Sequence, residues 1–106
     1  PDVYHIFKGG SDFNGLKLLG PQAIHVFHMN DYPANPPRKE MNDSHRVYPG
    51  DGVAPIGKIL RMLRDNNCRC VLSLELFNRD YWKQDPMVVA KTGLEKMRTS
   101  VAKALA

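Results

Sequence analysis

Three short stretches of the chain are rich in apolar and strand-forming residues, and turn residues follow each of them. They are residues 2–7, 23–30 and 69–77. Continuous apolar runs of this length are typical of strands in a parallel sheet, where both faces are buried. The first stretch, Asp2–Phe7, is predicted to be the end of a strand, because Val3, Tyr4 and Ile6 favour extended backbone.

Amphipathic segments separate and follow these strands. Ser11 is suited to cap a short helix that ends near Leu19. Pro55 fits the first turn of a second helix. The apolar residues of that helix recur with helical spacing at Ile56, Ile59, Leu60 and Leu63. A third helix is predicted to begin after an N-cap at Asp85 and to run to about Leu105.

The alternation of strands and helices predicts an α/β fold with parallel strands and helical crossovers. Three parallel strands leave both faces and both edges of a sheet in need of cover, which this chain does not supply. The sequence therefore indicates part of a larger fold. Residues 32–54, rich in Pro and Gly, form a long irregular segment after His28. Since such segments are usually functional or disordered, we expect a functional role.

Composition and charge narrow the class of protein. The chain has 106 residues, 42% hydrophobic and 25% charged, and no apolar run is long enough to span a bilayer. The net charge of +4 is spread out, which favours a solvated helix face over a nucleic-acid surface, so neither a membrane nor a nucleic-acid partner is expected. Cys68 and Cys70 are expected to stay reduced, which favours the cytoplasm. The chain begins at Pro1, so we expect a processed or cut N-terminus and leave a signal peptide open.

His28 and Glu75 are the polar side chains that two of the strands would carry into a site. Because side chains alternate along a strand, His28 is predicted to share a face with Val26 and Asn30, and His25 to lie on the other face. A carboxylate inside an apolar strand is costly unless a cation, a donor or a proton accompanies it. Ligands of parallel α/β sheets bind beyond the carboxyl ends of the strands, so a metal ion shared by His28 and Glu75 is predicted.

Asp2, in the first stretch, adds a second carboxylate. Together Asp2, His28 and Glu75 form an oxygen and nitrogen ligand set that suits one divalent metal ion, Mn²⁺, Mg²⁺, Co²⁺ or Zn²⁺. Asp2 and His5 are three residues apart, so on a strand their side chains would point to opposite faces. Both reach the site only if the chain curls over just after Asp2.

Two further groups lie near the predicted site. His45 belongs to a polar segment, residues 43–52, and is interpreted as a solvated turn residue. Tyr81 and Trp82 form an aromatic loop before the last helix. We expect both to pack against that helix, with cover of the mouth of the site as the alternative.

Four motifs follow one another over nearly the whole chain. They are Asp2-Val3-Tyr4-His5, Val26-Phe27-His28-Met29-Asn30-Asp31, Arg46-Val47-Tyr48-Pro49-Gly50-Asp51-Gly52 and Ser73-Leu74-Glu75-Leu76-Phe77. Their order and spacing resemble the C-terminal part of xylose isomerase-like TIM barrels, the sugar phosphate isomerase/epimerase family. The resemblance implies that residues 1–106 are a partial (β/α)₈ barrel domain: the end of strand six, strands seven and eight, and their helices.

The resemblance also implies roles for individual residues. In the family, the positions matching Asp2, His28 and Glu75 bind one divalent metal, the position matching His5 lies beside substrate, and the one matching Arg46 contacts substrate hydroxyl or phosphate groups. The implied enzyme isomerises or epimerises a sugar or sugar phosphate by proton transfer through an enediolate. Glu75 and His5 are then the candidate catalytic residues, and a metal-promoted hydride shift is the alternative reaction.

A barrel of this type needs about 250 residues. The first half, which would carry a further metal-binding Glu and an acid/base partner, is absent from this sequence. We therefore expect the chain alone to be inactive. The missing half would come from a longer protein, from a partner chain or from a self-associating copy.

Two alternative functions stay open. An endonuclease IV-like enzyme, which cuts DNA at abasic sites with three metals, would also fit Asn30 and Asp31. Such an enzyme carries an Asp-x-His pair that binds zinc. That pair falls on Asp43 and His45 only if the alignment of this sequence is shifted by one residue. The other alternative is a non-catalytic barrel remnant that associates with another chain through exposed strand edges.

Overall fold

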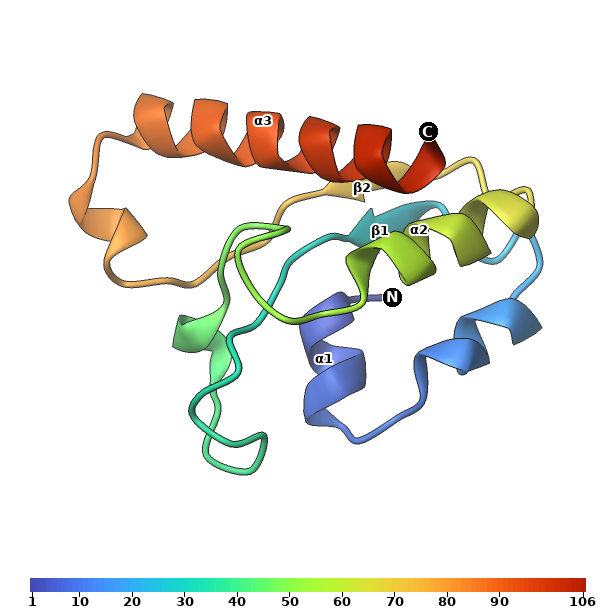
Figure 1. Ribbon diagram of the computed structural model, residues 1–106, viewed down its shortest axis with the longest axis horizontal. Coiled ribbons are helices and arrows are strands. Elements are labelled where there is room, and N and C mark those ends of the chain that lie inside the picture. Colours follow the sequence, from blue (N-terminus) through green and yellow to red (C-terminus); the bar gives the residue numbers. More distant parts are fainter.

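A computed structural model describes the whole chain, residues 1–106. Figure 1 shows its helices and its two short strands, joined by long loops. The α-helices are α1 (Val3–Lys8), α2 (Ile56–Asp65) and α3 (Pro86–Leu105), and the strands are β1 (Val26–His28) and β2 (Val71–Ser73). Three 3₁₀ helices lie in the connections: η1 (Phe13–Leu18), η2 (Asp43–His45) and η3 (Tyr81–Lys83).

Three parallel segments of backbone form the centre of the fold. β1 and β2 pair in parallel, with Val26 opposite Val71 and His28 opposite Ser73. Asp2 extends this ladder through an isolated parallel bridge to His28, whose N–H donates to the Pro1 carbonyl at 2.9 Å. The predicted parallel pairing is therefore confirmed, and the three segments end at one common edge.

The prediction of a strand over Asp2–Phe7 is wrong beyond Asp2, because the chain turns there into α1. Asp2 caps this helix by accepting a hydrogen bond from the His5 N–H at 3.1 Å. A capping carboxylate and the packing of buried Val3 and Tyr4 outweigh the extended preference of these residues. The turn places His5 one helical turn beyond Asp2, which meets the condition that the chain curls over just after Asp2.

β2 is shorter than predicted, and this changes the position of Glu75. The strand ends at Ser73, so Glu75 lies two residues beyond it, with a side chain that is 39% exposed. The prediction that Glu75 lies inside an apolar strand is therefore wrong. Its carboxylate instead lies at the open carboxyl edge of the sheet, where it keeps part of its hydration.

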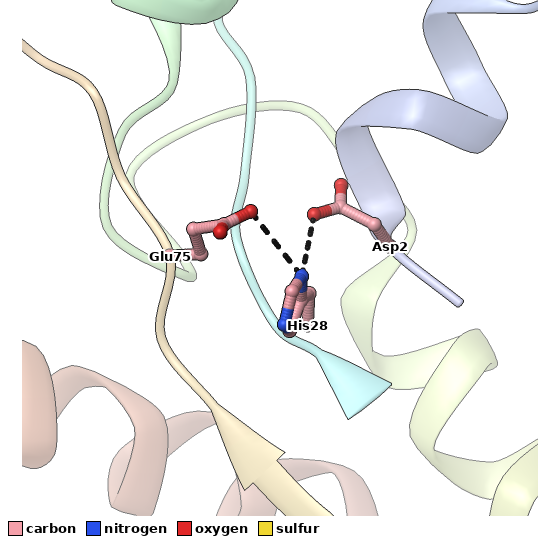
Figure 2. Close-up of side chains that lie close together, drawn as sticks. All are labelled: Asp2, His28 and Glu75. Atoms are coloured by element: carbon pink, nitrogen blue, oxygen red, sulfur yellow. Dashed lines mark ion pairs between the residues drawn. The ribbon is translucent and has the colours of Figure 1, made fainter. Parts of the chain in front are cut away.

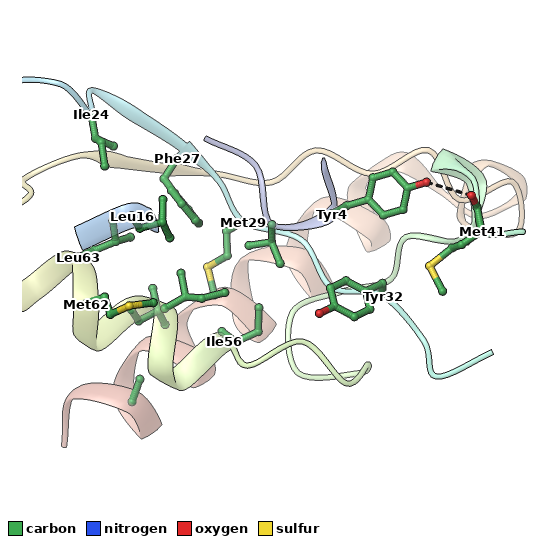
Figure 3. Packing of buried hydrophobic residues seen from close by; sticks show 14 residues of the cluster. Tyr4, Leu16, Ile24, Phe27, Met29, Tyr32, Met41, Ile56, Met62 and Leu63 are labelled. Carbon is green, nitrogen blue, oxygen red and sulfur yellow. Dashed lines mark hydrogen bonds between the residues drawn. The ribbon is translucent and has the colours of Figure 1, made fainter. Parts of the chain in front are cut away.

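The helices α2 and α3 pack against each other and cover one face of the strands (Figures 1 and 3). The predicted apolar stripe of α2 is confirmed, since Ile56, Ile59, Leu60 and Leu63 are buried. Residue Gly93 of α3 is buried, and a Cβ there would collide with the side chain of Leu74. The core of the fold is a single cluster: Val3, Tyr4, Leu16, Ile24, Phe27, Met29, Tyr32, Met41, Ile56, Ile59, Leu60, Met62, Leu63 and Ala104.

The helices α3 and η1 begin at or next to the predicted capping residues. Asp85 caps α3 as predicted, accepting from the Met87 N–H at 2.8 Å. The first short helix is the 3₁₀ helix η1, and its cap is Asp12 rather than Ser11. No helix of the chain combines the length and the apolar character needed to cross a membrane.

The opposite face of the sheet is open. Val26 and Val71, which pair with each other, are 46% and 64% exposed, whereas Phe27 on the helix-covered face is fully buried. By strand alternation, Val26 lies on the same face as His28. The open face of the sheet is therefore the face that carries the candidate site.

Candidate metal centre and cleft

Asp2, His28 and Glu75 converge at the carboxyl edge of the three parallel segments (Figure 2). The Nδ1 atom of His28 lies 3.3 Å from Oδ2 of Asp2 and 3.2 Å from Oε2 of Glu75. One ligand-type atom from each residue lies within 4.8 Å of the others. The structure thus brings together the three residues that the sequence predicts as metal ligands.

The donor set fits a divalent cation. Ligand atoms about 2.1 Å from a tetrahedral ion lie about 3.4 Å apart, close to the two separations at His28 Nδ1. Two carboxylates and a neutral imidazole also balance a charge of two, and their oxygen and nitrogen atoms suit zinc, manganese, cobalt or magnesium. The identity of Asp2, His28 and Glu75 as ligands stays a prediction.

Asn30 supports the carboxylate of Asp2. Its amide Nδ2 lies 3.1 Å from each carboxylate oxygen of Asp2, and its Oδ1 accepts the Tyr4 N–H at 2.8 Å. Asn30 is fully buried, so this orientation is fixed by the fold. Partners of this kind hold metal-binding side chains in place. Its position two residues after His28 was the available sequence signal for this role.

Arg46 is buried in the middle of the site. Its Nη1 lies 3.5 Å from Oδ2 of Asp2 and 3.2 Å from Oε2 of Glu75, and its Nη2 contacts Asp43. The guanidinium also lies over the ring of Tyr4, 4.7 Å from the centroid. The family resemblance implies a substrate contact for Arg46. The structure adds that it already pairs with three carboxylates, which holds those side chains close together.

The contact between Arg46 and His5 determines the tautomer of the imidazole. Nη2 of Arg46 lies 2.8 Å from Nε2 of His5. A guanidinium can only donate hydrogen bonds, so Nε2 accepts and the proton of the neutral ring sits on Nδ1. The His5 side chain is 59% exposed and lines the cleft described below. His5 can therefore offer an N–H donor to a bound molecule.

Asp31 organises the long loop that follows β1. Its carboxylate accepts four backbone N–H groups, those of Tyr32, Gly50, Gly52 and Ala54, at 2.8 to 3.1 Å. Burial raises the pKa of the Asp31 carboxyl above its usual value, while these four hydrogen bonds oppose the rise. Both oxygens are occupied by the loop, so Asp31 acts as a structural anchor.

We expect Asp31→Asn to destabilise the protein by about 2–4 kcal/mol, because the amide NH₂ would face buried N–H donors that lose their acceptor. Urea denaturation would measure the change in the free energy of unfolding. Asp51→Asn is the matched control, since Asp51 forms an exposed pair with Lys96 at 2.6 Å. Such pairs contribute about 1 kcal/mol or less. Equal losses in the two variants would contradict the anchoring role.

A cleft of about 570 Å³ opens beside the three predicted ligands. Its lining residues are His5, Asn42, Asp43, Ser44, Arg46, Glu75, Phe77, Arg79 and Trp82. Most of these residues are polar, and the volume falls within the range of about 300–1,000 Å³ that is usual for small-molecule sites. The arrangement therefore places Glu75 at the wall of a site that can hold a small polar molecule.

The two aromatic residues of the predicted aromatic loop have different positions. Tyr81 stacks on Tyr48, with ring centroids 4.3 Å apart. Trp82 is 65% exposed and lines the cleft. The expectation that both residues pack against the last helix is therefore wrong for Trp82, because the tip of the loop turns its side chain toward the cleft.

His45 lies outside the metal cluster. Its Nδ1 accepts the Asn42 N–H at 2.9 Å, closing a capping box around η2. The neighbouring Asp43 contacts Arg46. Asp43 and His45 are the possible zinc pair of the endonuclease IV-like alternative. Each of them is bound to another residue instead.

Comparison with known proteins identifies the family. The sequence profile described as "xylose isomerase-like TIM barrel" matches residues 1–100. The chain belongs to this family. An inosose isomerase of Bacillus velezensis is 29% identical over 102 residues, a match that covers 96% of this chain and 36% of that protein.

Solved structures give the same relationship. The zinc-bound structure of the IolI protein is 27% identical and superposes with a TM-score of 0.89, over 97% of this chain and 37% of that one. A xylose isomerase domain protein of Alicyclobacillus acidocaldarius is 25% identical, with a TM-score of 0.81, over 99% of this chain and 37% of that one. The chain thus spans little more than a third of the length of these relatives.

Proposed function

We propose that this chain is the C-terminal part of a metal-dependent sugar or sugar-phosphate isomerase or epimerase. The observation that carries the proposal is the convergence of Asp2 and His28 on Glu75, a residue that also lines a polar cleft. The similarity to inosose isomerases and to a zinc-bound relative supports it.

Residues 1–106 would then form a partial barrel domain. In this proposal, Asp2 ends strand six, and β1 and β2 are strands seven and eight. The exposed pair of Val26 and Val71 would face the barrel interior once further strands complete the wall. Those strands would come from a longer protein or from an associating chain.

Asp2, His28 and Glu75 would hold one divalent ion. When bound, such an ion supplies positive charge next to the carbonyl and hydroxyl oxygens of a sugar and so stabilises an enediolate. Asn30 keeps the carboxylate of Asp2 oriented, and Arg46 holds those of Asp2 and Glu75 in place.

Glu75 is the proposed acid/base residue of this chain. Its Oε2 faces His28 and Arg46, whereas its Oε1 has no partner and is free to accept a proton. Glu75 would remove the proton from the carbon next to the carbonyl. The electron pair of the broken C–H bond then remains in the enediolate. Return of a proton to the neighbouring carbon gives the isomer, and return to the other face of the same carbon gives the epimer. The second acid/base group would lie in the missing half of the barrel.

His5 would contact the substrate as a hydrogen-bond donor. Because Nε2 accepts from Arg46, the Nδ1–H is the group available to a substrate oxygen. Arg46 would act mainly by orienting His5 and the carboxylates, with a substrate contact where it lines the cleft.

Turnover in deuterium oxide tests the proposal. The intact metal-loaded protein would be incubated with a panel of ketoses and aldoses, and products would be followed by NMR. Incorporation of solvent deuterium at the reacting carbon is expected for proton transfer through an enediolate, whereas a hydride shift would keep the original hydrogen. Absence of any interconversion across the panel would contradict the proposed function.

The nuclease alternative has less support in the structure. Asp31 is occupied by four backbone N–H groups, and Asp43 and His45 do not form a ligand pair. Cleavage of abasic DNA with a steep salt dependence, or binding of three metals, would favour it over the isomerase.

A further inference from the structure

One cation on the wall of the cleft has no counter-charge. Arg46 pairs with Asp2, Asp43 and Glu75, which are the carboxylates in and next to the cleft. Arg79 also lines the cleft, is exposed and has neither an ion pair nor a hydrogen bond. The positive charge of Arg79 is therefore available to a molecule that enters the cleft.

The loop that carries Arg79 is fixed to the rest of the site. The side-chain amide of Asn78 donates to the carbonyl of Arg46 at 3.0 Å, and its Oδ1 accepts the N–H groups of Asp80 and Tyr81. The stacking of Tyr81 on Tyr48 holds the other end of this loop. These contacts position Arg79 on the wall before a ligand binds.

The neighbours of Arg79 favour a ligand that has both an anionic group and an apolar surface of carbon atoms. Asp80, the adjacent acidic residue, pairs with Lys83 at 3.1 Å and so does not neutralise Arg79. Phe77 and Trp82, 40% and 65% exposed, give the same wall two aromatic surfaces. A guanidinium presents a planar fork of donors that matches the oxygens of a phosphate or a carboxylate.

We propose that Arg79 is a substrate-binding residue that selects an anionic sugar, a sugar phosphate or a sugar acid, by pairing with its oxyanion. This proposal rests on the proposed isomerase function. The carbonyl end of the substrate lies at Glu75, and the anionic end lies against Arg79. Trp82, which lines the same cleft, is the aromatic surface that would contact the carbon chain.

Binding to the intact metal-loaded protein tests this proposal without relying on turnover. The probes are D-fructose, D-fructose 6-phosphate and D-fructuronate, which differ only at the sixth carbon, and isothermal titration calorimetry gives their affinities. We expect both anions, or the one whose oxyanion fits, to bind at least about tenfold more tightly than fructose. Comparison of the two anions distinguishes phosphate from carboxylate recognition.

Substitutions at Arg79 connect this preference to one side chain. Arg79→Gln is expected to weaken binding of the preferred anion by about 10- to 100-fold and to leave the affinity for fructose within about twofold. Arg79→Lys, which keeps the charge, should retain part of the preference. Arg98→Gln is the matched control, because Arg98 is an exposed arginine of α3 outside the cleft.

A fluorescence signal gives a second readout, because Trp82, the one tryptophan among residues 1–106, lines the cleft. Binding of the preferred anion should change the emission of Trp82, and Trp82→Phe should remove that change. This readout places the bound anion in the cleft rather than elsewhere on the surface.

Two outcomes would overturn the proposal. The first is equal affinity for the three probes, or binding of none of them. The second is a preference for an anion that persists in Arg79→Gln. If neutral sugars are turned over with no anion preference, only this inference fails. If the anion preference depends on Arg79 but no sugar is turned over, the proposed isomerase function fails and an anion-binding cleft remains.

Discussion

Glu75→Gln is expected to reduce kcat of the intact protein by at least about 1,000-fold while leaving the fold unchanged. An amide cannot take up the proton that the carboxylate accepts, and loss of such a group alone costs about 100- to 10,000-fold. The substitution also removes a proposed metal ligand, whose carboxylate lies 3.2 Å from Nδ1 of His28. Because the side chain is partly exposed and nearly isosteric with glutamine, circular dichroism and the thermal unfolding of the metal-free protein should change little.

The control for this variant is Glu95→Gln. Glu95 is an exposed residue of α3 that lies outside the cleft, and the same chemical change there should leave kcat unaltered. Steady-state kinetics of both variants, at saturating metal, make the comparison. Turnover of Glu75→Gln within about tenfold of the unmodified protein would remove Glu75 from any role in proton transfer.

His28→Gln is expected to lower the affinity of the intact protein for Zn²⁺ or Mn²⁺ by at least about 100-fold. Loss of residues that only support metal ligands costs about 10- to 100-fold, and loss of a ligand atom should cost more. Titration calorimetry and the metal content of the purified protein measure the effect. His25→Gln is the matched control, because His25 is exposed and lies outside the cluster of Asp2, His28 and Glu75.

Thermal unfolding provides an independent measure of the same interaction. A metal at about 100 times its Kd stabilises a folded protein by about 2.7 kcal/mol, and this stabilisation is lost when a chelator removes the metal. The unmodified protein and His25→Gln should show this dependence, and His28→Gln should not. Metal affinity that persists in His28→Gln would show that the three residues do not form the metal site.

The residues of the candidate site could be predicted from sequence because each lies at a place that local pattern identifies. His28 and Glu75 each come at or after the end of an apolar run, and parallel strands bring such ends to one edge. The α2 stripe and the Asp85 cap depend on spacing and on local hydrogen bonds, and both are present as predicted. The metal-binding role of the three residues remains a prediction.

Tertiary contacts decided the partners of these residues. The pairing of Arg46 with Asp2 and Glu75 joins positions 44 and 29 residues apart along the chain, and no local pattern encodes that distance. Asn30 and Asp31 follow His28 within three residues, yet Asn30 orients Asp2 and Asp31 anchors a loop. Their roles depend on hydrogen-bond partners that come from distant segments.

Hydrophobic periodicity and capping act over a few residues, so they were enough to predict the order of strand and helical segments and the polar side chains that come near the ends of the apolar runs. Only the tertiary structure decided that the chain turns into a helix directly after Asp2, that Glu75 lies beyond its strand, and that Arg79 keeps an unpaired charge on the wall of the cleft. Each of these depends on burial and on partners far apart in the chain, where packing outweighs local preference.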